Sequence, residues 1–104
     1  MSFRITGGKG FHIVFPNGYG VSVQFGPGNY GSNYDAPFTP YETALQDAGA
    51  RGADKAEVAI FQESKKGLLE FPAELGGEGD TVCGYLDAEQ VLRVMNWAAK
   101  QWEA

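Results

Sequence analysis

The stretch FHIVFPNGYGVSVQF, residues 11–25, decides how this chain folds. Asn17-Gly18 is the dipeptide most typical of a two-residue type I′ turn between antiparallel strands. With these two residues as the loop, one face of the hairpin carries His12, Val14, Tyr19, Val21 and Val23. The opposite face carries Phe11, Ile13 and Phe15. The sequence therefore predicts a hairpin with apolar side chains on both faces, and the second face needs a cover of its own.

Patterns outside the hairpin predict the rest of the sheet. Strands are expected within residues 3–25, at 56–62, at 68–71 and at 81–85, with a charged turn at 64–67. Their spacing favours an antiparallel sheet of four to five strands.

Two helices are predicted from their capping residues. Thr39-Pro40 followed by Glu42 predicts a short helix near 40–48. Asp87 and Gln90 form a capping box, and the apolar residues from Val91 onward recur with helical spacing over roughly 88–102. The expected fold class is α+β, with this C-terminal helix packed on one face of the sheet.

Length and composition restrict the class of protein. A chain of 104 residues is expected to form a single domain over residues 1–104. The net charge of −5 argues against a nucleic-acid-binding module, which normally has a basic face. The single Cys83 cannot form an internal disulfide, and the N-terminus does not resemble a signal peptide. A single cysteine fits a reducing compartment better than secretion, and no apolar run approaches the length of a membrane span, so a cytoplasmic protein is expected.

His12 and Cys83 are the only candidates for nucleophilic catalysis that stand out. A thiolate–imidazole pair needs only spatial proximity, so a small enzyme using these two residues is one hypothesis. A cysteine buried in a strand is usually inert, which favours a purely structural role. One histidine, one cysteine and no close carboxylate cluster do not predict a metal site, and no cofactor is expected.

The glycine-rich stretch 26–35 is the best candidate for a small ligand. Its aromatic, amide and carboxylate side chains could stack on a flat ring and bond its edge. Residues of these types are equally typical of turns whose aromatic rings cover the core. The candidate ligand-binding residues are Asn29, Tyr30, Asn33, Tyr34 and Asp35.

Acidic residues dominate the stretch from Gly67 to Leu92, which contains no Lys or Arg. Such a surface fits a basic partner protein, although part of the charge serves solubility and helix capping. The residues proposed to meet a partner are Glu70, Glu74, Glu78 and Asp80, together with the aromatic sheet residues Phe11 and Phe15.

The run FPNGYGVSVQFGPGNY at 15–30, the later DTVCGY at 80–85 and a helix containing Trp97-Ala-Ala resemble small proteins of phages and prophages. This resemblance covers about half of the chain, and its motifs are turns and strands. Small phage proteins of this kind are often counter-defence factors, including anti-CRISPR inhibitors and proteins that sequester nucleotide signals.

The resemblance implies a non-enzymatic protein that inhibits a host bacterial immune effector by stoichiometric binding in the host cytoplasm. Two alternatives stay open: a sponge for a nucleotide-like immune signal, and the small enzyme described above. The hairpin with two apolar faces also predicts a possible homodimer. Neither a nucleic acid nor a membrane is expected as a partner.

Overall fold

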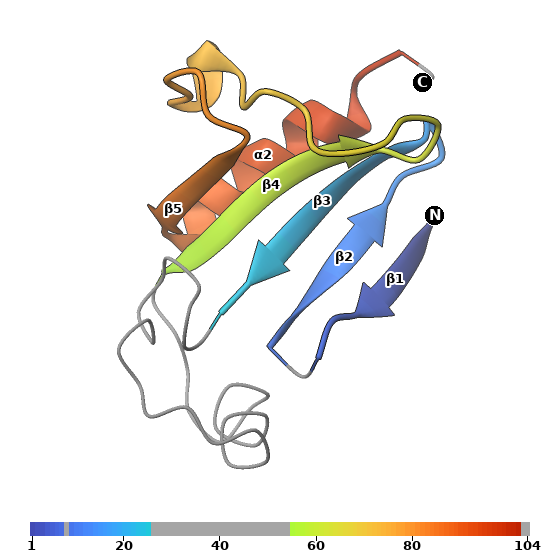
Figure 1. Cartoon of the computed structure of the whole chain (residues 1–104), viewed down its shortest axis with the longest axis horizontal. Helices are drawn as coiled ribbons and strands as arrows, with labels where there is room; N and C mark the ends of the chain where they lie inside the picture. The colour runs from blue at the N-terminus through green and yellow to red at the C-terminus, as the bar shows by residue number, and fades with distance from the viewer. Residues whose placement is uncertain (8, 26–54, 103–104) are drawn as a thin grey trace.

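The computed structural model describes residues 1–7, 9–25 and 55–102. In these residues five antiparallel strands form one open sheet in the order β1-β2-β3-β4-β5, so each strand pairs with its neighbour in the sequence (Figure 1). One helix packs against β3, β4 and β5. The elements are β1 (Ser2–Ile5), β2 (Gly10–Val14), β3 (Tyr19–Gln24), β4 (Ala56–Gln62), the 3-10 helix η2 (Ala73–Leu75), β5 (Val82–Leu86) and α2 (Ala88–Ala99).

This arrangement confirms the predicted α+β fold with an antiparallel sheet and a C-terminal helix. The strand predicted at 68–71 is reduced to a single bridge between Leu68 and Phe61. The C-terminal helix ends at Ala99, three residues before the predicted end. The helix predicted near 40–48 lies outside the described residues.

The turn between β2 and β3 contains three residues, and the predicted two-residue turn is wrong. Phe15 N–H donates to the carbonyl of Tyr19 over 2.8 Å, and Gly18 N–H donates to the carbonyl of Phe15 over 2.9 Å. Gly18 takes the left-handed backbone with φ of 85°, whereas Asn17 has no positive φ. Pro16 explains the difference, because in a two-residue loop it would have to donate an N–H to Tyr19, and proline has none.

The third loop residue shifts the pairing of β2 with β3 by one position. The side chains of β3 therefore lie on the opposite face, relative to those of β2, from the one that the sequence predicts. Phe11 lies opposite Val23 and Ile13 opposite Val21, so these four apolar side chains share the face covered by α2. The hairpin with two apolar faces is therefore also wrong. The other face carries His12, Val14, Gly20, Ser22 and Gln24.

The core lies between α2 and the central strands. Val21, Val58 and Ile60 from the sheet and Ala98 from the helix have no exposed surface, and Val94 is 1 % exposed. Removing such side chains from water is the main stabilising contribution to a domain of this size.

The open face of the sheet is organised around Phe61 of β4. A Cβ built on Gly20 would lie 2.2 Å from the Phe61 ring, so the ring occupies the space that a larger residue on β3 would need. The His12 ring packs on the same aromatic ring at a centroid distance of 5.1 Å. Near them, Arg4 and Glu63 form an ion pair between two exposed side chains.

A bulge in β5 changes the direction of the side chains just before α2 begins. Ala56 pairs with Leu86 and Val58 with Cys83, so β5 contains one residue more than β4 across this interval. Tyr85 absorbs the extra length in a left-handed conformation with φ of 60°. Leu86 consequently reaches the core immediately before the helix, while the side chain of Tyr85 stays exposed.

Both ends of α2 are capped by side chains. Asp87 Oδ1 accepts from Gln90 N–H, and Gln90 Oε1 accepts from Asp87 N–H, which confirms the predicted capping box. At the other end, Asn17 Nδ2 donates to the carbonyls of Ala98 and Gln101 over 2.8 and 2.9 Å. The hairpin turn therefore satisfies carbonyl groups that the end of the helix leaves open.

Candidate functional site

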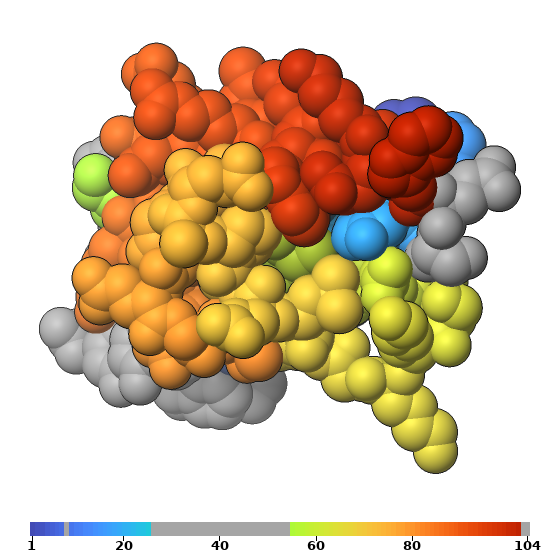
Figure 2. Space-filling view, turned by 90° about the horizontal axis from the view of Figure 1, so that it is seen from above, coloured from blue at the N-terminus to red at the C-terminus, as the bar shows by residue number. Residues whose placement is uncertain are grey.

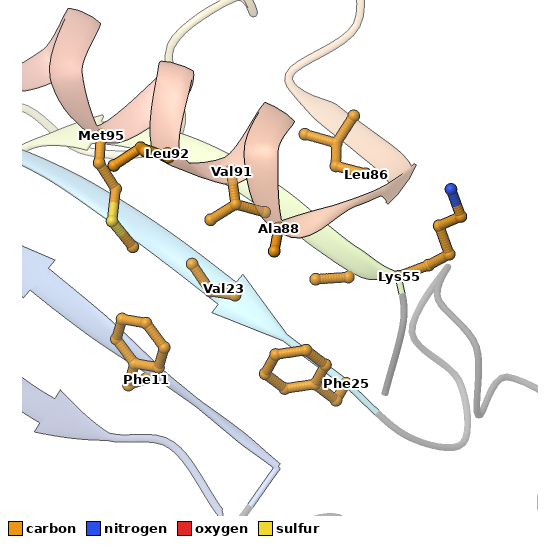
Figure 3. A pocket seen from close by; sticks show the side chains of 10 residues that line it. Phe11, Val23, Phe25, Lys55, Leu86, Ala88, Val91, Leu92 and Met95 are labelled. Atoms are coloured by element: carbon orange, nitrogen blue, oxygen red, sulfur yellow. The ribbon is translucent and has the colours of Figure 1, made fainter. Parts of the chain in front are cut away.

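An apolar groove between α2 and the sheet is the candidate binding site that the described residues offer to a partner. It has a volume of about 260 Å³. Figure 3 shows Val91, Leu92 and Met95 of the helix above Phe11 and Phe25 of the sheet, with Lys55 at one end. The groove presents hydrocarbon and aromatic surface on both sides, so it suits apolar side chains of a partner better than a polar metabolite.

The position of α2 explains why the groove exists. The helix packs mainly against β3 and extends to β4 and β5. Phe11 on β2 is therefore covered along one side only and remains half-buried. Leu92 points away from the core with 56 % of its surface exposed. In the described part of the chain, one helix is too narrow to cover five strands, and the groove lies along the margin of the sheet that this helix leaves open.

The apolar surface continues from the groove onto the edge strand β1. The Phe3 ring meets the Phe11 ring edge to face, with centroids 6.1 Å apart and planes at 70°. Phe3 is 71 % exposed and Ile5 is 84 % exposed. Both pair with residues of the helix-covered face of β2, so they extend the same face beyond α2.

The two aromatic residues predicted to meet a partner have different environments. Phe11 lines the groove, so it can contact a bound molecule. Phe15 is only 7 % exposed within the core and is not a surface residue. The shifted register is the reason, since it turns Phe15 toward α2.

The four predicted acidic residues are exposed on the segment that joins β4 to β5. This segment and α2 lie side by side in Figure 2, and η2 packs against the helix. Glu74 Oε1 accepts a hydrogen bond from Trp97 Nε1 over 3.2 Å. The exposed residues are Glu70, Glu74, Glu78 and Asp80.

The acidic segment and the apolar groove flank opposite sides of α2. Gln90 and Arg93 line a shallow hollow with Glu74, whereas Val91 and Met95 line the groove. A partner wrapped around the helix would therefore meet apolar surface on one side and carboxylates on the other.

Cys83 lies in a small hollow that it shares with Glu78 and Asp80. Burial raises the pKa of the Cys83 thiol above its ordinary value, and the carboxylates of Glu78 and Asp80 raise it further. The thiol is therefore protonated at neutral pH, and a protonated thiol is a poor nucleophile.

His12 and Cys83 do not form the pair required by the enzyme hypothesis. His12 shares the open face with Ser22 and Ala59 through the strand register, whereas Cys83 lies opposite Val58 on the helix-covered side. Two strands also separate β2 from β5, which corresponds to about 14 Å across the sheet. The geometry excludes a direct proton transfer between these two side chains.

Sequence reasoning missed several residues of the apolar surface. Leu92 and Met95 belong to the apolar residues from Val91 onward that predict the helix, and Phe3 and Ile5 fall within the strands expected at 3–25; the sequence predicts no exposed surface for any of them. The alternation of Phe3 and Ile5 in the first strand was the signal for this surface. These residues are exposed because the strand forms a sheet edge that the helix does not reach. The predicted ligand residues Asn29, Tyr30, Asn33, Tyr34 and Asp35 lie outside the described residues.

Residues 1–7, 9–25 and 55–102 contain no group of three or more His, Cys, Asp or Glu side chains placed to hold a metal ion. In the same residues the helix is too short to cross a bilayer. Comparison of the chain with protein-family models, curated proteins and solved structures finds no match.

Proposed function

We propose that this chain is a non-enzymatic inhibitor that binds a host bacterial immune effector, a component of a CRISPR system, stoichiometrically in the host cytoplasm. The apolar groove beside α2 is the observation that supports binding. Leu92 and Met95 offer a helix face to a partner, and Phe11 forms the opposing wall. The choice of an immune effector follows from the resemblance of residues 15–30 and 80–85 to phage proteins.

The chemistry of the surface defines the partner segment that fits it. Apolar anchors of the partner would enter the groove, and a few buried anchors carry most of the affinity in protein interfaces. Basic residues beside those anchors would meet Glu74, Glu78 and Asp80 on the other side of α2. Such charges mainly accelerate association and exclude acidic partners.

Leu92→Asp tests the groove in a way that should leave the fold intact, because Leu92 is already 56 % exposed. An aspartate there would be buried without a partner in the complex, so affinity for a purified effector should fall at least about tenfold. Asn96→Asp is the matched control: it makes the same change in net charge at an exposed position of the same helix but lines neither the groove nor the hollow beside Glu74.

Calorimetry against purified CRISPR effectors gives the affinity, and phage plaque counts on a restricting host give the activity. Wild type and Asn96→Asp should bind and raise plaque numbers, whereas Leu92→Asp should do neither. An affinity unchanged by Leu92→Asp would contradict binding at the groove. If wild type neither binds an effector nor changes restriction, the inhibitor function is wrong.

A further inference from the structure

The outer edge of β1 has backbone groups ready to pair with another strand. Thr6 N–H donates to the carbonyl of Gly10, so the backbone of Thr6 faces β2. In an antiparallel pair every second residue along the strand faces the same neighbour. Ser2 and Arg4 therefore direct their N–H and C=O groups toward β2. The corresponding groups of Phe3 and Ile5 point to the outer edge, where β1 pairs with no further strand of residues 1–7, 9–25 and 55–102.

The side chains along this edge are apolar and exposed in an alternating pattern. Met1, Phe3 and Ile5 are 76 %, 71 % and 84 % exposed. Phe3 and Ile5 lie on the helix-covered face, and Met1 continues their alternation. Arg4 points to the other face, where it pairs with Glu63.

The two edges of the sheet differ in how they are protected. Natural edge strands are commonly blunted by proline, a bulge or an inward charge. β5 has the bulge at Tyr85, while β1 has an uninterrupted register with β2 and contains no proline. The edge of β1 therefore keeps the straight form that strand pairing needs.

We propose that β1 pairs antiparallel with β1 of a second copy of this chain, around a two-fold axis at Phe3. In this register Phe3 lies opposite the partner's Phe3, Met1 opposite the partner's Ile5, and Ser2 opposite the partner's Arg4. Three apolar pairs share one face, and no two like charges face each other. Moving the register by two residues would set Arg4 against the partner's Arg4. This self-complementarity favours a second copy over an unrelated strand.

The pairing would join two five-stranded sheets into one, with both α2 helices on the same side. The side chains of Phe3, Ile5 and Phe11 of each copy would then form the bottom of an apolar groove between the two helices. One short strand per copy buries less than the roughly 1,200–2,000 Å² of a stable interface, so the dimer forms at high protein concentration. This inference stands apart from the proposed function, because its tests involve this chain alone.

Light scattering across a concentration series is the first test. The wild-type mass should rise from 11.2 kDa toward twice that value as the concentration increases from about 10 µM to about 1 mM, the range for a small interface. Phe3→Lys should stay monomeric with an unchanged circular dichroism spectrum, because two ammonium groups would meet at the axis. Leu92→Lys, which places the same charge at an exposed apolar residue of α2, should dimerise as wild type does. A wild-type protein that stays monomeric at every concentration would overturn the proposal.

Cysteine cross-linking tests the register itself. In a Cys83→Ser background, Phe3→Cys should give a covalent dimer on mild oxidation with copper phenanthroline, since directly opposed Cα atoms lie about 5.5 Å apart. Ile5→Cys should stay uncross-linked, because its symmetry mate would be about 13 Å away along the strands. Efficient cross-linking through Ile5→Cys, or none through Phe3→Cys, would refute the two-fold axis at Phe3.

Discussion

Asn17 joins the hairpin turn to the end of α2, and replacing it tests whether this contact fixes the helix on the sheet. Its Nδ2 donates to the carbonyls of Ala98 and Gln101, and its Oδ1 accepts from Tyr19 N–H over 3.0 Å. Asn17→Ala removes all three bonds. The backbone at Asn17 has no positive φ, so alanine fits there without strain. The measured loss of unfolding free energy can therefore be attributed to the three hydrogen bonds.

The expected loss of stability follows from these three bonds. A typical hydrogen bond contributes about 0.5–1.5 kcal/mol net, and part-buried groups left without a partner add to the cost. Water can reach some of the freed carbonyls at the helix end, so we expect Asn17→Ala to lower the free energy of unfolding by about 2 kcal/mol. For a domain of this size that corresponds to a fall of about 8–16 °C in Tm.

Urea denaturation followed by tryptophan fluorescence measures this change, because Trp97 lies on α2 against Tyr19.

Asn17→Asp keeps the acceptor for Tyr19 N–H but sets a negative charge against the carbonyl end of the helix. It should therefore be less stable than Asn17→Ala at pH 7, and its deficit should shrink as acid protonates the carboxyl. Ser64→Ala, in the exposed turn after β4, is the control and should stay within about 0.5 kcal/mol of wild type. An Asn17→Ala variant as stable as that control would refute the reasoning.

Three further substitutions are expected to have measurable effects. Gly20→Ala should cost about 1–2 kcal/mol of unfolding free energy because its methyl group displaces the Phe61 ring, and it should cost less in a Phe61→Ala background, which a double-mutant cycle measures. Asp87→Ala removes the N-terminal cap of α2 and should cost about 1 kcal/mol, measured by thermal unfolding. Burial is the largest cause of the raised pKa of Cys83, and Glu78 is the next. The thiol therefore ionises at a lower pH in the unfolded chain than in the folded protein, and the free energy of unfolding falls as the pH rises above about 9.0. Glu78→Gln should move the alkaline midpoint of iodoacetamide alkylation to lower pH, and an unmoved midpoint would contradict that coupling.

The sequence predicted the elements whose signals are local. Asp87 and Gln90 placed the start of α2 correctly, because a capping box is made by residues three apart. The strand at 56–62 was predicted at the bounds observed for β4, since its apolar residues follow the pattern of a buried strand. The end of α2 was placed too late, because Trp102 continues the helical spacing but is 92 % exposed beyond the last turn.

The hairpin shows where local reasoning failed even though the needed residue was visible. Asn17-Gly18 is a strong signal for a two-residue turn, but Pro16 cannot supply the N–H that this turn requires. A one-residue change in loop length exchanges the faces of a strand, so the predicted surface residue Phe15 became part of the core.

The sequence by itself determined the fold class, the antiparallel strands and the capped start of α2, because these depend on residues close together along the chain. Only the tertiary structure decided which side chains remain exposed. Phe3 and Ile5 have the same alternation as buried strand residues, and they are exposed because α2 is too narrow to reach β1. How far a helix extends over a sheet is set by the packing of Val94 and Ala98 across the whole domain, and no short stretch of sequence encodes it.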